Sequence, residues 1–201
     1  VYGGAALFSF LLHAIEYLTV LSIGGTTHIL EDEVRKSAVA LASYYQQHAV
    51  TVGIITPQML RPYRNSDPSL QRVITCGERL SRIAPPDYEL LNGYGMSELV
   101  AFVTTFKVEQ AYENTPIGTA MESVEVQLLD DDNNPVAQGE EGEICAIGMF
   151  DAQYFKDPDK SARVFQRLPD GRTLVHTGDM GYMNEEGNIV FSNRKDWMVK
   201  V

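Results

Sequence analysis

The sequence predicts an α/β protein in which a layered α/β subdomain is followed by a β-rich subdomain that forms a distorted barrel. Helix-like and strand-like segments alternate in the first half, whereas short strands separated by turn clusters dominate after Pro116. The composition supports a globular chain, because 44% of the 201 residues are hydrophobic and 21% are charged. A chain of this length can bury a substantial core.

The first half begins with two helix-like segments. The apolar stretch from Ala5 to Ile23 predicts a buried helix rather than a membrane span, because His13 and Glu16 interrupt it and no Lys or Arg flanks it. A second helix is expected to open at Glu31, where acidic residues favour the positive end of the helix dipole. Its apolar face combines Val34, Ala38, Leu41, Ala42 and Tyr45.

Three strand-like runs complete the first subdomain, at residues 51–56, 72–75 and 89–91. We therefore expect an α/β unit over residues 1–107. The second half contains four further strand-like runs, at 124–129, 142–147, 173–176 and 189–191. Turn clusters separate them, and the last two read as a hairpin, so residues 108–195 predict the β-rich unit.

The charge excludes two partner classes. Acidic residues outnumber basic ones by 27 to 16, giving a net charge of -11, and no basic stripe is present that would neutralise nucleic acid or an anionic membrane. Cys76 and Cys145 are too few for a disulfide framework or a cysteine-based zinc site and indicate a reducing, cytoplasmic setting. For His13 and His176, structural roles are favoured, because no cluster at metal-ligand spacing accompanies either.

The segment from Asn92 to Glu98 combines two glycines, an aromatic ring, a hydroxyl and a carboxylate. Glycines let the backbone approach a ligand, Tyr94 offers a stacking surface, Ser97 can bind a phosphate oxygen, and Glu98 is a hard ligand suited to Mg²⁺. A strand-to-helix turn in which Ser97 is the N-cap would have the same sequence.

Two later segments carry polar groups suited to a nucleotide. Asp179 follows Thr177 and Gly178 in what reads as a tight turn between strands, where a carboxylate can accept both hydroxyls of a ribose. Arg194 can contact sugar or phosphate oxygens. Taken alone, each segment is better explained by an ordinary turn, capped by its own side chain or paired at the surface.

The order of these pieces resembles the adenylate-forming superfamily, and most closely the adenylation domains of nonribosomal peptide synthetases. The resemblance rests on five short motifs in the family order: Asn92 to Glu98, Pro116-Ile117-Gly118, Gly142-Glu143-Ile144, Thr177-Gly178-Asp179 followed by Gly187-x-Ile189, and Arg194-x-Asp196. These motifs extend over essentially the whole chain. The resemblance implies the large N-terminal lobe of such an enzyme.

The resemblance also implies residue roles. Tyr94 resembles the aromatic that stacks on adenine, Ser97 the hydroxyl at the α-phosphate, and Glu98 the carboxylate on the Mg²⁺ side. Asp179 and Arg194 resemble the residues that bind ribose. The remaining nucleotide-binding positions are Gly77, Glu78, Asn92 and Gly93, and Asp196 resembles the hinge, with residues 196–201 starting a C-terminal lobe.

The family's first pocket segment, aligned on Phe10 to Gly24, places Leu11 where amino-acid-activating members carry the Asp that pairs with the substrate ammonium. An ammonium left unpaired in an apolar pocket is costly, so an apolar or non-α-amino acid becomes plausible. The alternative is that this alignment is shifted by a few residues and that these positions are ordinary core side chains. The pocket positions in this alignment are Leu11, Leu12, Ile15, Ile54, Ile74, Cys76, Gly93, Ala101 and Phe102.

The resemblance implies an ATP-dependent, Mg²⁺-dependent ligase that converts a carboxylic or amino acid to an acyl-adenylate and passes it to a thiol. The expected acceptor is a carrier-protein phosphopantetheine, and the alternative is coenzyme A in a stand-alone acyl- or aryl-CoA ligase. The family's phosphate loop and catalytic lysine are expected outside residues 1–201, so the chain is interpreted as an internal fragment. A non-catalytic module that binds a nucleotide or a partner is the other alternative.

Overall fold

The computed structural model describes residues 1–4, 11–64, 67–100 and 102–195, and the side chain of Leu11 is outside this description. The chain forms two compact units. One contains residues 1–93 and 106–115, and the other contains residues 94–105 and 116–201. None of the helices in the described ranges is long and apolar enough to cross a membrane.

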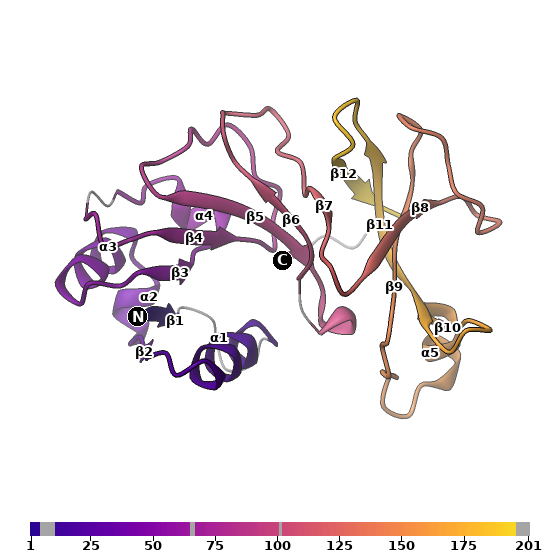
Figure 1. The fold of residues 1–201 in the computed structure, drawn as a ribbon, viewed down its shortest axis with the longest axis horizontal. Coiled ribbons are helices and arrows are strands. Elements are labelled where there is room, and N and C mark those ends of the chain that lie inside the picture. Colours follow the sequence, from indigo (N-terminus) through magenta and orange to yellow (C-terminus); the bar gives the residue numbers. More distant parts are fainter. Residues whose placement is uncertain (5–10, 65–66, 101, 196–201) are drawn as a thin grey trace. The chain divides into compact units, whose positions relative to one another are not determined.

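The first unit is built on a mainly parallel sheet. Strands β1 to β5 follow the order β2-β1-β3-β4-β5, all parallel, and β6 and β7 extend the same sheet with an antiparallel pair (Figure 1). The elements of this sheet and its helices are β1 (Tyr2–Gly4), α1 (Leu11–Ser22), β2 (Thr27–Ile29), α2 (Asp32–Arg35), α3 (Ala38–Gln47), β3 (Val52–Ile54), α4 (Pro57–Leu60), β4 (Arg72–Thr75), β5 (Glu89–Gly95), β6 (Phe102–Lys107) and β7 (Thr119–Ala120). Strand β7 and most of β6 belong to the second unit.

Helices α3 and α1 cover opposite faces of β1. A methyl group added at Gly3 would lie 2.3 Å from the ring of Tyr45 in α3, whereas one added at Gly4 would lie 3.4 Å from the carboxylate of Glu16 in α1. Because successive residues of a strand point to opposite faces, the two helices sandwich the strand. The expected layered α/β architecture is confirmed.

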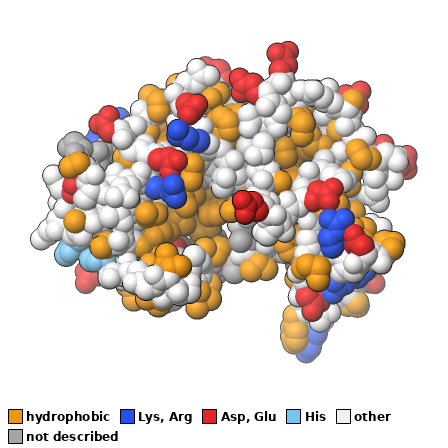
Figure 2. Space-filling model, viewed as in Figure 1, with side chains coloured by type: hydrophobic (Ala, Val, Ile, Leu, Met, Phe, Trp, Pro, Cys, Tyr) orange, Lys and Arg blue, Asp and Glu red, His pale blue; other side chains and the backbone are white. Residues whose placement is uncertain are grey.

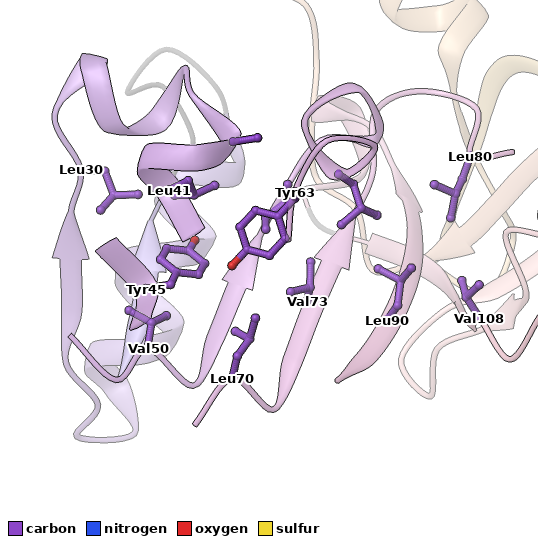
Figure 3. Packing of buried hydrophobic residues seen from close by; sticks show 13 residues of the cluster. Leu30, Leu41, Tyr45, Val50, Tyr63, Leu70, Val73, Leu80, Leu90 and Val108 are labelled. Carbon is purple, nitrogen blue, oxygen red and sulfur yellow. The ribbon is translucent and has the colours of Figure 1, made fainter. Parts of the chain in front are cut away.

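The core of this unit lies on the α3 side of the sheet. Tyr45 is fully buried and its hydroxyl donates to the carbonyl oxygen of Gly3 over 2.8 Å. It packs into one hydrophobic cluster with Leu41, Val73 and Leu90, which come from α3, β4 and β5 (Figure 3). Burial of apolar side chains of this size supplies most of the free energy that holds a helix on a sheet.

Helix α1 differs from the predicted buried helix. The polar residue Glu16 is only 1% exposed, and its carboxylate accepts a long 3.5 Å hydrogen bond from the Tyr2 hydroxyl. Leu18 and Leu21, by contrast, are 71% and 59% exposed. The prediction used the average hydropathy of the segment, which does not reveal which side of the helix faces the sheet.

The single helix expected from Glu31 onward is two helices. Helix α2 ends at Arg35, and Ser37 is the N-cap of α3, with its side chain accepting a hydrogen bond from the Ala40 amide over 3.3 Å. Ala38, Leu41 and Tyr45 are buried as predicted. A serine hydroxyl that satisfies a free amide favours a helix start, so the break occurs inside an otherwise continuous apolar pattern.

The second unit contains a five-stranded antiparallel sheet. Its path is β10-β11-β9-β8, and β12 also pairs with β11, so the long β11 pairs with β10 near its start and with β12 near its end. The elements are the 3-10 helix η1 (Ser97–Leu99), β8 (Glu125–Leu129), β9 (Gly142–Gly148), α5 (Pro158–Val164), β10 (Phe165–Arg167), β11 (Thr173–Met183) and β12 (Ile189–Arg194) (Figure 1). The expected hairpin of the last two strands is present.

The prediction of a tight turn at Asp179 is wrong. Residues 177–179 lie inside β11, where the register against β9 shifts between His176 and Met180. Gly178 has a positive φ of 71°, which glycine adopts without strain. The glycine therefore marks a β-bulge within a strand rather than the end of one.

The unit boundaries also differ from the expected division at residue 107. Leu99 and Val103 pack with Ala146 and Val175 in the second unit, whereas Val108 belongs to the core of the first. Strands β5 and β6 consequently run from one unit into the other. Composition along the chain cannot locate such a boundary, because it depends on which residues pack together.

Candidate functional site

Three of the predicted nucleotide-binding residues are in direct contact within the second unit. The Tyr94 hydroxyl donates to Oδ2 of Asp179 over 2.7 Å, and the Arg194 guanidinium donates to Oδ1 of the same carboxylate over 2.9 Å. Asp179 and Arg194 lie opposite each other on the paired strands β11 and β12, and Tyr94 lies near the end of β5. The aspartate is thus held by a donor on each oxygen.

Burial explains the protonation states in this group. Asp179 is 5% exposed, so its carboxylate needs both donors to offset the loss of solvent. Burial, followed by the negative charge of Asp179, raises the pKa of Tyr94 well above its usual value. The tyrosine therefore remains a hydrogen-bond donor at neutral pH.

Thr177 fixes the bulge that carries the aspartate, and sequence reasoning missed this role. Its hydroxyl donates to the carbonyl oxygen of Ile144 over 2.6 Å and accepts from the Asp179 amide over 3.0 Å. Thr177 is 3% exposed. Two buried hydrogen bonds on one hydroxyl link β9 to the backbone of the predicted ribose-binding residue.

Ser97 and Glu98 follow β5 in the 3-10 helix η1, between Tyr94 and the buried Leu99. The residue at the N-cap position is Met96, not Ser97, and no side-chain hydrogen bond caps this turn. The alternative that Ser97 serves as an N-cap is therefore wrong. Ser97 is exposed and Glu98 is half-buried, so both polar groups remain accessible from solvent.

Tyr154 holds the Glu98 carboxylate and was not identified from the sequence. Its hydroxyl donates to Oε1 of Glu98 over 2.5 Å, and burial followed by that hydrogen bond raises the tyrosine pKa. The Tyr154 amide donates to the Ser161 hydroxyl over 2.8 Å, and Lys160 Nζ lies 3.9 Å from the ring centroid. The tyrosine is thereby fixed to α5, more than fifty residues from Glu98 in the chain.

The other predicted nucleotide-binding residues belong to the first unit. Gly77 and Glu78 are exposed in the segment after β4, and Gly77 has a positive φ of 87°. Asn92 and Gly93 are buried in β5, where Asn92 lies opposite Thr75 of β4. Only backbone groups of Gly93 can reach a ligand, since the residue has no side chain.

Two of the predicted pocket residues are adjacent in the first unit. Ile54 of β3 is opposite Ile74 of β4, on the sheet face that alternates with the core-facing Val73. Leu12, Ile15 and Cys76 are half-buried. Hydrophobic side chains gather in a hollow over this unit between α1 and the central strands (Figure 2).

Other pocket positions are distributed differently. Phe102 is half-buried in β6 and belongs to the second unit. The side chain of Leu11, together with Ala101 and the predicted hinge residue Asp196, lies outside the described residues. A separate depression of about 240 Å³ is lined by Phe150, Ser161, Arg167 and their neighbours and holds none of the predicted site residues.

His176 is not isolated, contrary to expectation. Its Nδ1 lies 3.6 Å from the Cys145 sulfur and 3.4 Å from Oε2 of Glu143. Burial, followed by the charge of Glu143, raises the pKa of the Cys145 thiol to about 12, so it is protonated at neutral pH. The alternating pattern of β9 places residues 143 and 145 on one face, but only the strand pairing brings His176 to them.

A family model matches more than half of the chain. The family model described as AMP-binding enzyme matches residues 1–152. Bacitracin synthase 1 of Bacillus licheniformis is 28% identical over 205 residues, which cover 100% of this chain and 4% of that protein. D-alanine–D-alanyl carrier protein ligase of Lactiplantibacillus plantarum is 28% identical over 213 residues, covering 96% of this chain and 42% of the ligase.

The fold comparison agrees. The structure of PA1221, an NRPS protein containing adenylation and PCP domains, superposes with a TM-score of 0.87 and 25% sequence identity. The superposition covers 100% of this chain and 44% of that one. The chain therefore spans less than half the length of these relatives.

Proposed function

Because the chain belongs to the AMP-binding enzyme family, we propose that it is the part of an AMP-forming ligase that binds the nucleotide and the acid to be activated. The observation that supports this most strongly is the contact of Tyr94, Arg194 and Asp179. Tyr94 and Arg194, which are expected at a nucleotide from two separate motifs, both donate to the buried carboxylate of Asp179, which is expected there from a third.

In the proposed reaction, an oxygen of the substrate carboxylate attacks the α-phosphorus of ATP. The bond from that phosphorus to the bridging oxygen breaks, so pyrophosphate leaves and an acyl-adenylate forms. Such a displacement depends mainly on positioning and on neutralising charge. Asp179 would accept hydrogen bonds from the ribose, Tyr94 would stack on adenine, and the exposed Ser97 hydroxyl would donate to an α-phosphate oxygen.

The residues around Glu98 fit a magnesium ion. Tyr154 donates to Oε1, and Oε2 accepts no hydrogen bond from any residue in the described ranges, so one hard oxygen is available on the residue that follows Ser97 in the chain. Glu98 would hold the ion, which supplies positive charge to the phosphate oxygens when bound. Tyr154 would keep the carboxylate oriented toward it.

For the acid substrate, we propose a mainly apolar or non-α-amino carboxylic acid. The adjacent pair Ile54 and Ile74 supports this proposal, because neither side chain can pair with an ammonium group. Native mass spectrometry of the full-length protein with a pool of acyl- and aminoacyl-sulfamoyl-adenosines tests it. Retention of an α-aminoacyl member in preference to the apolar acyl members would contradict the proposal.

For the thiol acceptor, we propose the phosphopantetheine of a carrier protein. The similarity to a D-alanyl carrier protein ligase and to an NRPS protein with a PCP domain supports it. Transfer of a radiolabelled acid to a holo carrier protein and to coenzyme A, measured side by side, separates this acceptor from that of a stand-alone acyl-CoA ligase.

The experiment that tests the ligase is ATP–pyrophosphate exchange by the full-length protein, with Glu98→Gln as the diagnostic variant. The exposed Glu122→Gln is the matched control, because it makes the same chemical change away from the site. We expect Glu98→Gln to lower exchange and to raise the Mg²⁺ concentration required, and the control to do neither. An unchanged Mg²⁺ dependence would contradict the role of Glu98, and nucleotide binding without exchange by the unmodified protein would favour the non-catalytic module.

A further inference from the structure

Three side chains with metal-binding atoms converge on one side of the β9–β11 pair. Cys145 lies opposite His176 in the antiparallel register, and Glu143 precedes Cys145 by two residues on the same face of β9. The Cys145 sulfur, His176 Nδ1 and a Glu143 carboxylate oxygen all lie within 4.8 Å of one another. We call these three residues the β9–β11 cluster.

We propose that the β9–β11 cluster binds one Zn²⁺ ion through the thiolate of Cys145, Nδ1 of His176 and the carboxylate of Glu143. Sulfur, imidazole nitrogen and carboxylate oxygen are the donors that zinc prefers. Bond lengths of about 2.0–2.3 Å around a tetrahedral ion require ligand atoms about 3.3–3.7 Å apart. The observed nitrogen–sulfur and nitrogen–oxygen distances of 3.6 and 3.4 Å meet this requirement.

The protein already orients the carboxylate ligand. Oε1 of Glu143 accepts a hydrogen bond from the Gly178 amide over 2.9 Å, which leaves Oε2 directed toward His176. Glu143 is 6% exposed and Cys145 is fully buried, so neither side chain has much freedom to turn away. Outer hydrogen bonds of this kind fix the direction of a metal ligand and strengthen binding.

Lys195 would compete with zinc for the Glu143 carboxylate. Lys195 Nζ lies 3.5 Å from Oε2 of Glu143 and 2.6 Å from Oδ1 of the exposed Asp131. Zinc would displace the Lys195 ammonium from Glu143, and the ammonium would keep its ion pair with Asp131. The Cys145 thiol would lose its proton to solvent as the sulfur–zinc bond forms, and solvent water would complete the fourth coordination position.

The test is metal binding by the full-length protein after removal of metal with a chelator. Zn²⁺ affinity is measured by competition with a chromophoric chelator, and Co²⁺ is used as a spectroscopic probe of thiolate ligation. We expect Cys145→Ser and His176→Gln each to weaken Zn²⁺ binding by about tenfold or more. The matched controls Cys76→Ser and His48→Gln, which remove the same groups from the other unit, should leave it unchanged.

Lys195→Met provides a result that a purely structural cluster would not produce. Removing the competing ammonium should tighten Zn²⁺ binding, whereas Lys107→Met, at an exposed lysine paired with Glu109, should not. A thiolate-to-cobalt absorption band in the unmodified protein, absent in Cys145→Ser, would support the site without relying on the stability of any other variant. Equal Zn²⁺ affinity and equal Co²⁺ spectra for the unmodified protein and Cys145→Ser would overturn the proposal.

Discussion

The hydroxyl of Tyr94 donates to the buried carboxylate of Asp179 over 2.7 Å, although the two residues are 85 positions apart in the chain. This bond joins the end of β5 to the bulge of β11. It means that the ring expected to stack on adenine is fixed in place by the residue expected to bind ribose. The position of the Tyr94 ring therefore depends on Asp179, and the position of the Asp179 carboxylate depends on Tyr94.

Replacing Tyr94 with Phe removes this hydrogen bond and keeps the ring. The buried carboxylate loses one donor, so we expect the free energy of unfolding to fall by about 1 kcal/mol. Denaturant unfolding of the full-length protein measures it. Tyr112→Phe is the control, because the Tyr112 hydroxyl makes no hydrogen bond within the described ranges, and equal effects of the two variants would contradict the interpretation.

Replacing Asp179 with Asn removes the charge that pairs with Arg194 and the acceptor proposed for the ribose. We expect AMP affinity to fall by about tenfold to a hundredfold, because charge-assisted hydrogen bonds are worth about 1.5–3 kcal/mol. Isothermal titration with AMP measures the change. Asp159→Asn alters an exposed carboxylate of α5 and should leave AMP binding intact. Full AMP affinity in Asp179→Asn would rule out the proposed ribose contact.

Replacing Tyr154 with Phe frees the Glu98 carboxylate while keeping the ring under Lys160. A carboxylate that is less well oriented binds a metal ion more weakly, so we expect a higher Mg²⁺ concentration at half-maximal ATP–pyrophosphate exchange. Tyr182→Phe in β11 serves as the comparison. If Tyr154 only packs against α5, stability will change and the Mg²⁺ requirement will not.

Replacing Gly3 with Ala places a methyl group 2.3 Å from the ring of the fully buried Tyr45. Overpacking of a filled core costs about 1–3 kcal/mol, so we expect a lower midpoint of thermal unfolding. At Gly4 the nearest atom to an added methyl is 3.3 Å away, and Gly4→Ala should therefore be milder. A larger effect at Gly4 would show that the packing of Tyr45 is misassigned.

Asp130 predicts a pH dependence. The hydrogen bond from the Asn134 amide holds the pKa of its carboxyl below the usual value of 3.8, with a second bond from the Asp132 amide. A lowered pKa means that the ionised side chain stabilises the fold above the unfolded pKa, and that this contribution is lost as pH falls through the folded value. Asp130→Ala should thus lower the thermal midpoint at neutral pH.

The same difference should shrink as pH falls below the usual Asp pKa of 3.8 and through the lowered pKa of the folded carboxyl, where the carboxylate of the unmodified protein becomes protonated. Thermal unfolding of both proteins across this range measures it. Asp132→Ala, in the same turn, is the comparison. A destabilisation by Asp130→Ala that stays constant down to the most acidic pH would show that the charge of Asp130 is not responsible.

The fold class and several elements of this protein can be predicted from short stretches of its sequence alone. The α/β class, the strands at 72–75 and 142–147, and the buried face of Ala38, Leu41 and Tyr45 follow from hydrophobic period and turn residues, which act over a few positions. The motifs from Asn92 to Glu98 and from Thr177 to Asp179 carried the resemblance to the family, and the family model that matches residues 1–152 confirmed it.

Tertiary structure alone decided how those pieces meet. The bulge at Gly178, the hold of Tyr154 on Glu98 and the meeting of Glu143, Cys145 and His176 arise from strand register and from packing between distant segments. A shift of one residue in the register of β9 against β11 would turn Glu143 and Cys145 to the opposite face from His176. Register is set by the summed burial of many side chains, which no single motif encodes.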